Sequence, residues 1–159
     1  EHFFPWSPDR PFLYDLTVGT TQGEEESFDT VHSYFALRKW SCAPDARGVL
    51  RFCLNDRPLL LNGLLDQGYW PEGLYTPPSD AAVVHELQTI KELGFNLLRK
   101  HAKIEPQRWY YHCDKLGLIV WQDMVNGGEP YRLWFVTYLT NVLQPLLRKL
   151  PDTAASGVC

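Results

Sequence analysis

Three apolar runs alternate with two amphipathic segments in the middle of the chain. The runs lie at residues 59–65, 95–98 and 118–121. They are too apolar to alternate like half-exposed strands, and strands buried on both faces and joined by helical crossovers are typically parallel. The pattern therefore predicts strand, helix, strand, helix, strand in a parallel sheet.

Helix signals separate these runs. Ser79 or Asp80 can cap a first helix, whose apolar positions keep helical spacing up to Gly94. Pro106 suits the first residue of a second helix, and Gly117 suits its end. A third helical pattern covers residues 134–150 and contains Pro145, which should kink it; residues 151–159 carry no pattern and are expected to form a tail.

The N-terminal part has β character. Residues 12–18 alternate, residues 19–26 form a polar turn, and residues 27–40 predict one or two more strands. Two or three strands with open edges do not stand well alone, so this part looks like the end of a β-sandwich. Residues 41–48 have the composition of a linker, and Asn55-Asp56 predicts a hairpin turn between residues 49–54 and 58–61.

Polar side chains follow each of the three apolar runs. Asp66 follows the first, Arg99 and His101 follow the second, and Asp123 follows the third. The carboxyl ends of parallel strands share one side of a sheet, where such folds bind ligands, so these groups should converge. The loop after Asp66 is rich in aromatics and contains Trp70. It either packs over the rim of the sheet or shapes a pocket, and the sequence leaves both open.

Composition and charge weakly favour one class of function and argue against several others. Aromatic residues make up 14% of the chain and include six Trp, which weakly favours carbohydrate binding, although buried packing is the commoner cause. The net charge of −4 and the lack of a basic block give no reason to expect nucleic acid. The four cysteines form no C-x-x-C pair, which makes a zinc site improbable. No apolar stretch is long enough for a membrane span.

Several segments, in this order, resemble glycoside hydrolase family 2, the family of β-galactosidases, β-glucuronidases and β-mannosidases. They are residues 6–14 (WSPDRPFLY), 33–39 (SYFALRK), 61–63 (LNG), 95–99 (FNLLR) and 108–123 (RWYYHCDKLGLIVWQD). The resemblance implies an α/β plus β fold: the end of an immunoglobulin-like β-sandwich and linker at residues 1–48, then the first three β/α units of a TIM (β/α)8 barrel at residues 49–150, and a tail at 151–159.

Family members hydrolyse β-glycosides with retention, using an acid/base Glu and a nucleophile Glu. The family places these after the fourth and seventh barrel strands, so the resemblance implies that this chain holds neither. Asp66 and Asp123 follow different strands of the same sheet and could approach each other, but the sequence does not set their distance. None of the candidate substitutes matches the family's pattern: Asp66, Glu72, Glu105, Asp123 and Glu129. We therefore expect a fragment of a retaining glycoside hydrolase without catalytic residues. The alternative is a non-catalytic carbohydrate-binding or structural fragment.

The residues present are expected to form a wall of the sugar pocket: Asp66, Trp70, Arg99, His101, Trp121 and Asp123. Arg99 matches a family arginine that supports the acidic site, with a purely structural salt bridge as the alternative. Asp123 occupies the place of an acidic residue that binds magnesium in some β-galactosidases, but one carboxylate is not a metal site, so no metal and no cofactor are expected. Trp121 is more typical of a core than of a sugar platform. The residues after the first two strands depart from the β-galactosidase pattern, which leaves the sugar open.

Overall fold

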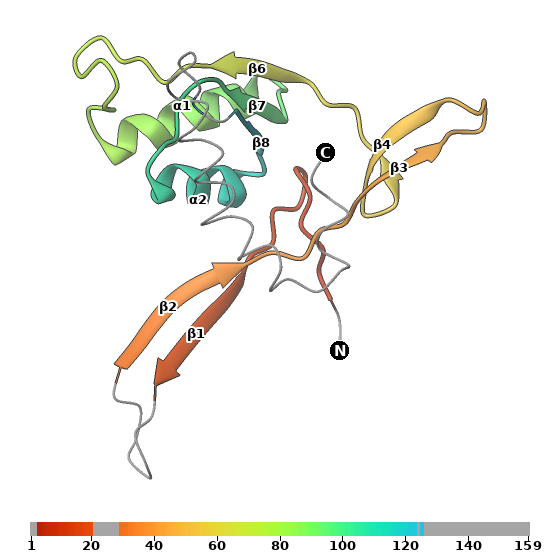
Figure 1. The fold of residues 1–159 in the computed structure, drawn as a ribbon, viewed down its shortest axis with the longest axis horizontal. Coiled ribbons are helices and arrows are strands. Elements are labelled where there is room, and N and C mark those ends of the chain that lie inside the picture. Colours follow the sequence, from red (N-terminus) through yellow and green to blue (C-terminus); the bar gives the residue numbers. More distant parts are fainter. Residues whose placement is uncertain (1–2, 21–28, 124, 126–159) are drawn as a thin grey trace, which may run out of the picture.

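The computed structural model describes residues 3–20, 29–123 and 125, and it combines antiparallel β segments with a parallel α/β unit (Figure 1). The antiparallel segments are a hairpin of β1 (Tyr14–Thr20) and β2 (Asp29–Phe35), and a group of β3 (Trp40–Pro44), β4 (Leu50–Leu54) and β5 (Arg57–Pro58). The α/β unit runs β6 (Gly63–Asp66), α1 (Asp80–Glu92), β7 (Leu97–Lys100), α2 (Gln107–Leu116) and β8 (Ile119–Gln122). The predicted combination of α/β and β parts is present.

The predicted parallel sheet is confirmed. Its strand order is β6-β7-β8, and both pairings are parallel. Leu98 in the central strand is fully buried and packs with residues of α1 and α2, including Leu87 and Trp109. On the other side of the same strands, Leu65 and Trp121 are 56% and 48% exposed. The helices therefore cover one face of the sheet, and the other face is exposed in its carboxyl half, whereas Leu97 and Ile119 in its amino half are buried.

The helix ends follow the predicted signals closely. The Ser79 hydroxyl accepts a hydrogen bond from the backbone N–H of Ala82 at 3.1 Å and caps α1. Gly117 ends α2 in the left-handed conformation at φ 79°. Pro106 lies one position before the first helical residue, Gln107, rather than opening the helix itself.

Two β segments differ from the sequence interpretation. Residues 41–48 were expected to be a linker, but β3 occupies the first part of this stretch and pairs with β4 in the register Ser41↔Cys53. Backbone pairing thus overrides a composition that suggests a loop. The first apolar run contributes only its last part to the parallel sheet, because the N–H of Leu59 still bonds to Phe52 of the hairpin at 2.8 Å. The turn at Asn55-Asp56 is confirmed, with φ of 52° and 63°.

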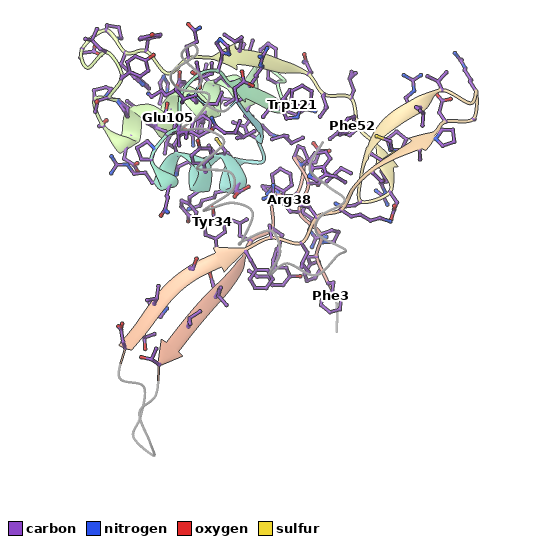
Figure 2. All side chains as sticks on the ribbon, viewed as in Figure 1. Phe3, Tyr34, Arg38, Phe52, Glu105 and Trp121 are labelled. Atoms are coloured by element: carbon purple, nitrogen blue, oxygen red, sulfur yellow. The ribbon has the colours of Figure 1, made fainter. Side chains whose placement is uncertain are left out.

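Trp6 anchors the N-terminal segment at the amino ends of β7 and β8. Its side chain is fully buried and packs with Leu97 and Ile119, the first residues of those strands. The indole N–H donates to the carbonyl of Asp114 in α2 at 2.7 Å. In Figure 2, Arg38 lies in the same region, where its guanidinium stacks over the Trp6 ring at 4.5 Å and pairs with Asp114. Apolar packing covers the amino ends of the strands, and the polar edge lies at their carboxyl ends.

Some expectations fall outside the described residues: most of the polar turn at 19–26, the third helix at 134–150 with Pro145, and the tail at 151–159. Within the part of the chain that the structure describes, no helix is long and apolar enough to cross a bilayer.

Candidate functional site

Two rows of register partners cross the carboxyl ends of the parallel strands. They are Leu65–Arg99–Trp121 and Asp66–Lys100–Gln122. Because successive side chains of a strand point to opposite faces, the two rows face opposite ways. Lys100 is only 1% exposed, on the helix side, whereas Trp121 is exposed on the open side. The polar edge thus has an open face and a buried face with different chemistry.

Three residues on the open face form what we call the edge cluster: Arg99, His101 and Asp123. Arg99 donates from Nε and Nη2 to Oδ2 of Asp123 at 3.1 and 2.9 Å, and His101 Nδ1 lies 2.7 Å from the same oxygen. Their side chains are 48%, 39% and 29% exposed. The hydrogen bond from Arg99, and then that from His101, holds the pKa of Asp123 below its usual range. Asp123 is therefore an ionised, oriented acceptor beside two donors.

Trp121 lies next to the edge cluster. It is the register partner of Arg99 and remains 48% exposed among the described residues. An exposed aromatic face beside hydrogen-bonding groups suits a ligand that has both C–H and O–H surfaces. The interpretation of Trp121 as a core residue does not describe its environment in this part of the chain.

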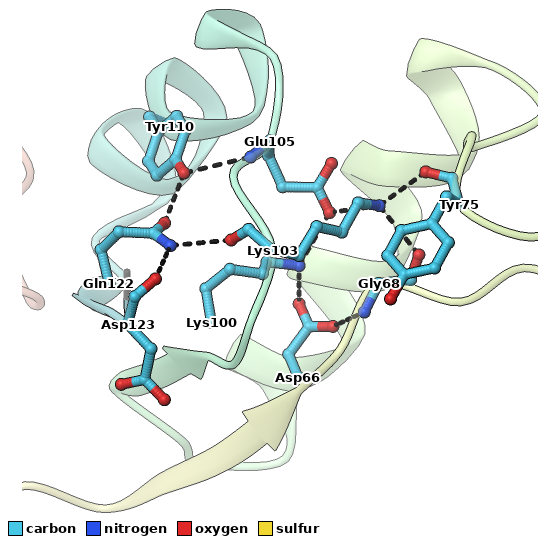
Figure 3. A network of polar contacts seen from close by, with 9 residues as sticks. All are labelled: Asp66, Gly68, Tyr75, Lys100, Lys103, Glu105, Tyr110, Gln122 and Asp123. Carbon is cyan, nitrogen blue, oxygen red and sulfur yellow. Dashed lines mark hydrogen bonds and ion pairs between the residues drawn. The ribbon is translucent and has the colours of Figure 1, made fainter. Parts of the chain in front are cut away.

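Four ionisable residues on the buried face pair with one another, and we call them the buried cluster: Asp66, Lys100, Lys103 and Glu105 (Figure 3). Lys100 Nζ lies 2.5 Å from Asp66 Oδ2 and 3.0 Å from Glu105 Oε1, and Lys103 Nζ lies 2.9 Å from the same oxygen of Glu105. Two ammonium groups balance two carboxylates. Among the described residues, no buried side-chain polar atom lacks a partner. Full pairing is the condition under which such a cluster is tolerated in a protein interior.

Gln122 connects the buried cluster to β8. Its side-chain amide donates to the carbonyl of Lys103 at 2.7 Å, and its Oε1 accepts from the Tyr110 hydroxyl at 2.5 Å (Figure 3). Burial raises the pKa of Tyr110, which keeps the phenol neutral and able to donate. The loop between β7 and α2 is thereby fastened to the neighbouring strand.

The structure brings together some of the predicted site residues and separates others. Arg99, His101 and Asp123 converge as expected, with Trp121 beside them. Asp66 lies on the other row, where it is engaged by Lys100 and by the N–H of Gly68 at 2.7 Å. Trp70 is partly buried against the core cluster between the sheet and the helices. Sugar contacts by these six residues stay predictions.

Sequence reasoning missed the pairing of Asp66, Lys100, Lys103 and Glu105 on the buried face, and the position of Glu86 beside Asp66. Glu86 in α1 lines a cavity of about 270 Å³ together with Asp66. Burial, and then the charge of Asp66, raises the pKa of Glu86. The available signal was weak: Lys100 lies two residues after the buried Leu98 and therefore on the same face of the strand, and a charge at such a position needs a partner.

The edge cluster is poorly suited to hold a metal ion. Asp123 is the only carboxylate in it, and that carboxylate is already engaged by Arg99 and His101. Divalent cations such as Mg²⁺ and Ca²⁺ prefer several oxygen ligands. Among the described residues, no group of three or more His, Cys, Asp or Glu side chains is placed to bind a metal.

Comparison with known proteins points to one enzyme family. The chain is 28% identical over 130 residues to an exo-β-D-glucosaminidase of Amycolatopsis orientalis, covering 76% of this chain, and 29% identical over 140 residues to a β-galactosidase of Leuconostoc mesenteroides, covering 86% of it. The solved structure of a family 2 β-galacturonidase from Eisenbergiella tayi matches with a TM-score of 0.64 and 26% identity, over 77% of this chain and 20% of that one. The resemblance to glycoside hydrolase family 2 is confirmed.

The similarity to this family covers only a short part of the length of each relative. The chain spans 12% of the length of each of the two curated relatives named above. No protein-family model matches the chain. The family 2 likeness and the position of the edge cluster together provide the basis for a functional proposal.

Proposed function

We propose that this chain forms part of the sugar-binding wall of a retaining β-glycoside hydrolase. The observation that carries the proposal is the edge cluster: an ionised carboxylate, a guanidinium and an imidazole at the carboxyl edge of a parallel sheet, on the face without helices. In barrel enzymes this edge carries the active site. The likeness to family 2 enzymes supports β-glycosides as the ligand class.

In this proposal, residues 1–48 are the end of an immunoglobulin-like sandwich and residues 49–150 begin a TIM barrel. Two observations support the presence of two parts, with the change between them near Gly63, because the pairing of β3 with β4 spans residue 48. The strands before Gly63 are antiparallel and those after it are parallel. The open face of the parallel sheet also exposes Leu65 and Trp121, as expected of strands whose inner face is completed by further strands.

Arg99 and His101 would donate hydrogen bonds to sugar hydroxyls, and Asp123 would accept one. Trp121 would offer its ring to a C–H face of the sugar. Retaining hydrolysis also needs two carboxyl groups about 5–5.5 Å apart. The carboxylates of the two clusters are already bound by cations, which makes them poor candidates for proton transfer or nucleophilic attack. We therefore propose that this chain contributes binding and not the acid and the nucleophile.

The test measures binding of methyl β-glycosides by saturation-transfer NMR. The probes are the galactoside, glucoside, glucuronide, mannoside and glucosaminide, and the proteins are the chain and its Asp123→Asn and Arg99→Met variants. We expect one probe to bind and both variants to weaken it about tenfold or more, since each removes hydrogen bonds to or from a charged group. Lys39→Met, which alters an exposed ion pair outside this edge, is the control. Absence of binding by every probe would refute the proposal.

A further inference from the structure

The loop between β6 and α1 presents a pair of exposed tyrosines beside the polar edge. This loop, residues 67–76, is called the aromatic loop below. It folds back on itself through two backbone hydrogen bonds between Trp70 and Leu74, of 2.7 and 2.9 Å. Within it, Tyr69 and Tyr75 are 59% and 49% exposed. Their rings lie edge to face at 4.6 Å between centroids, and their hydroxyls are 2.8 Å apart.

Lys103 fixes both ends of the aromatic loop. Its ammonium donates to the carbonyl of Gly68 at 2.9 Å and to the carbonyl of Tyr75 at 2.6 Å, and it pairs with Glu105 at 2.9 Å. An ammonium group has three N–H donors, so all of them are used. The side chain is 8% exposed and reaches the loop from the connection between β7 and α2 (Figure 3). One buried cation thus closes the loop at its two ends.

The other residues of the buried cluster also hold the start of the aromatic loop in place. Asp66 accepts from the N–H of Gly68, and Lys100 joins Asp66 to Glu105. Gly68 has φ of +66°, and a Cβ there would lie 2.5 Å from Oε1 of Glu105 and 2.7 Å from Nζ of Lys103. The backbone of the loop therefore approaches the cluster as closely as a residue without a side chain allows.

A rigid tyrosine pair loses little conformational entropy when a ligand binds to it. Tyrosine offers a large amphipathic ring with few rotatable bonds, and here the loop is already ordered before any ligand binds. The Lys103 ammonium lies 5.2 Å from the centre of the Tyr75 ring, and the exposed parts of both rings remain available for the C–H face of a sugar. The aromatic loop and the edge cluster also belong to the same edge, because the N–H of His101 donates to the carbonyl of Asp66 at 2.8 Å.

We propose that Tyr69 and Tyr75 form a second sugar-contact surface, which binds the pyranose ring next to the one at the edge cluster, and that Lys103 is the positioning residue that holds this surface in place. The proposal rests on the proposed function, which supplies the first sugar. It adds a preference for disaccharides over monosaccharides, and it assigns that preference to a loop outside the edge cluster.

The binding test compares matched probes: methyl β-galactopyranoside with lactose, methyl β-glucopyranoside with cellobiose, and methyl β-glucosaminide with its β-1,4-linked disaccharide. We expect the disaccharide of the preferred sugar to bind about three- to tenfold more tightly, the factor of one aromatic contact. Tyr69→Ala and Tyr75→Ala should abolish this gain and leave the monosaccharide affinity unchanged. Phe3→Ala, which truncates another ring that is 71% exposed, is the matched control and should retain the gain.

The first readout of the positioning test needs no ligand. In a chain labelled with 3-fluorotyrosine, Lys103→Met should shift the ¹⁹F signals of Tyr69 and Tyr75 and leave that of Tyr14 in place. It should also remove the disaccharide gain. If Lys103→Met does not fold, Lys103→Arg, which keeps the charge and changes the donor geometry toward the carbonyls of Gly68 and Tyr75, should shift the same two signals.

The outcomes separate the two proposals. Equal affinity for monosaccharide and disaccharide overturns the second contact surface and leaves the edge cluster in place. Unchanged ¹⁹F signals in Lys103→Met overturn the positioning role alone. Failure of every monosaccharide and disaccharide to bind removes the proposed function and this inference with it.

Discussion

Lys100 offers a direct measurement of what the buried cluster contributes to folding. Its Nζ is the shared partner of Asp66 and Glu105, and its side chain is 1% exposed. The ammonium also lies 4.3 Å from the centre of the Trp109 ring, a favourable cation–π position. Replacement by Met keeps much of the chain length and removes the charge. One buried cation, from Lys103, then faces two buried carboxylates.

Removing one partner of a buried ion pair typically costs about 3–5 kcal/mol, because the remaining charge is left uncompensated. We expect Lys100→Met to lower the free energy of unfolding by about that amount. The matched control is Lys39→Met, since Lys39 pairs with Asp56 at 2.7 Å but the two side chains are 65% and 67% exposed. An exposed pair of this kind contributes about 0–1 kcal/mol. The two variants delete the same chemical group in opposite environments.

The assay is urea unfolding followed by tryptophan fluorescence, with the midpoint and the slope fitted for both variants. A domain of ordinary stability has about 5–15 kcal/mol in total, so Lys100→Met should move the midpoint far or abolish the cooperative transition. A midpoint shift for Lys100→Met no larger than that for Lys39→Met would refute the reasoning. It would mean that the carboxylates regain solvation or protons at little cost.

Three further changes test other parts of the structure. Gly117→Ala should destabilise more than Gly94→Ala, by about 1–3 kcal/mol in thermal unfolding, because both have positive φ but only at Gly117 would a Cβ meet a backbone atom, the carbonyl oxygen of Pro8 at 2.3 Å. Burial raises the pKa of Glu86 in the folded chain above its ordinary 4.5. The stability associated with the protonated carboxyl is therefore present below pH 4.5 and is lost as the pH rises through the folded pKa. Glu86→Gln, which stays neutral, should stabilise the chain at pH 7 and not at pH 4. Cys42, which is exposed, should react with iodoacetamide in the native chain before the buried cysteines do, as peptide mass spectrometry can show.

The parallel α/β unit could be predicted from the sequence because its signals are local. Ser79 marks the start of α1 and Gly117 the end of α2, and the pairs Leu97-Leu98 and Ile119-Val120 open the two strands β7 and β8. β3 was missed for the opposite reason. Its residues include Ala43 and Pro44, which are depleted in strands, and only the pairing with β4 makes the segment a strand. Pairing between strands depends on tertiary structure, so the composition of one segment does not predict it.

In the candidate site, too, local sequence predicts some features, and pairing between strands decides the others. Convergence of Arg99 with Asp123 follows from strand order alone, since both lie at carboxyl ends of adjacent parallel strands. The separation of Asp66 from them depends on one residue of register: Asp66 pairs with Lys100, not with Arg99. A shift of one position along a strand moves a side chain to the opposite face. The sequence shows which residues reach the edge but not which face each one takes.

This register also explains how one edge supports two kinds of chemistry. The row that contains Arg99 faces away from the helices, where charged groups keep contact with solvent and remain available to a ligand. The row that contains Lys100 faces the helices, where a charge is stable only if it is fully paired, and its partners come from loops far apart in the sequence. The pairing that the interior demands therefore fastens the aromatic loop to the connection after β7. Stability on the buried face and geometry on the open face are consequences of the same alternation along three short strands.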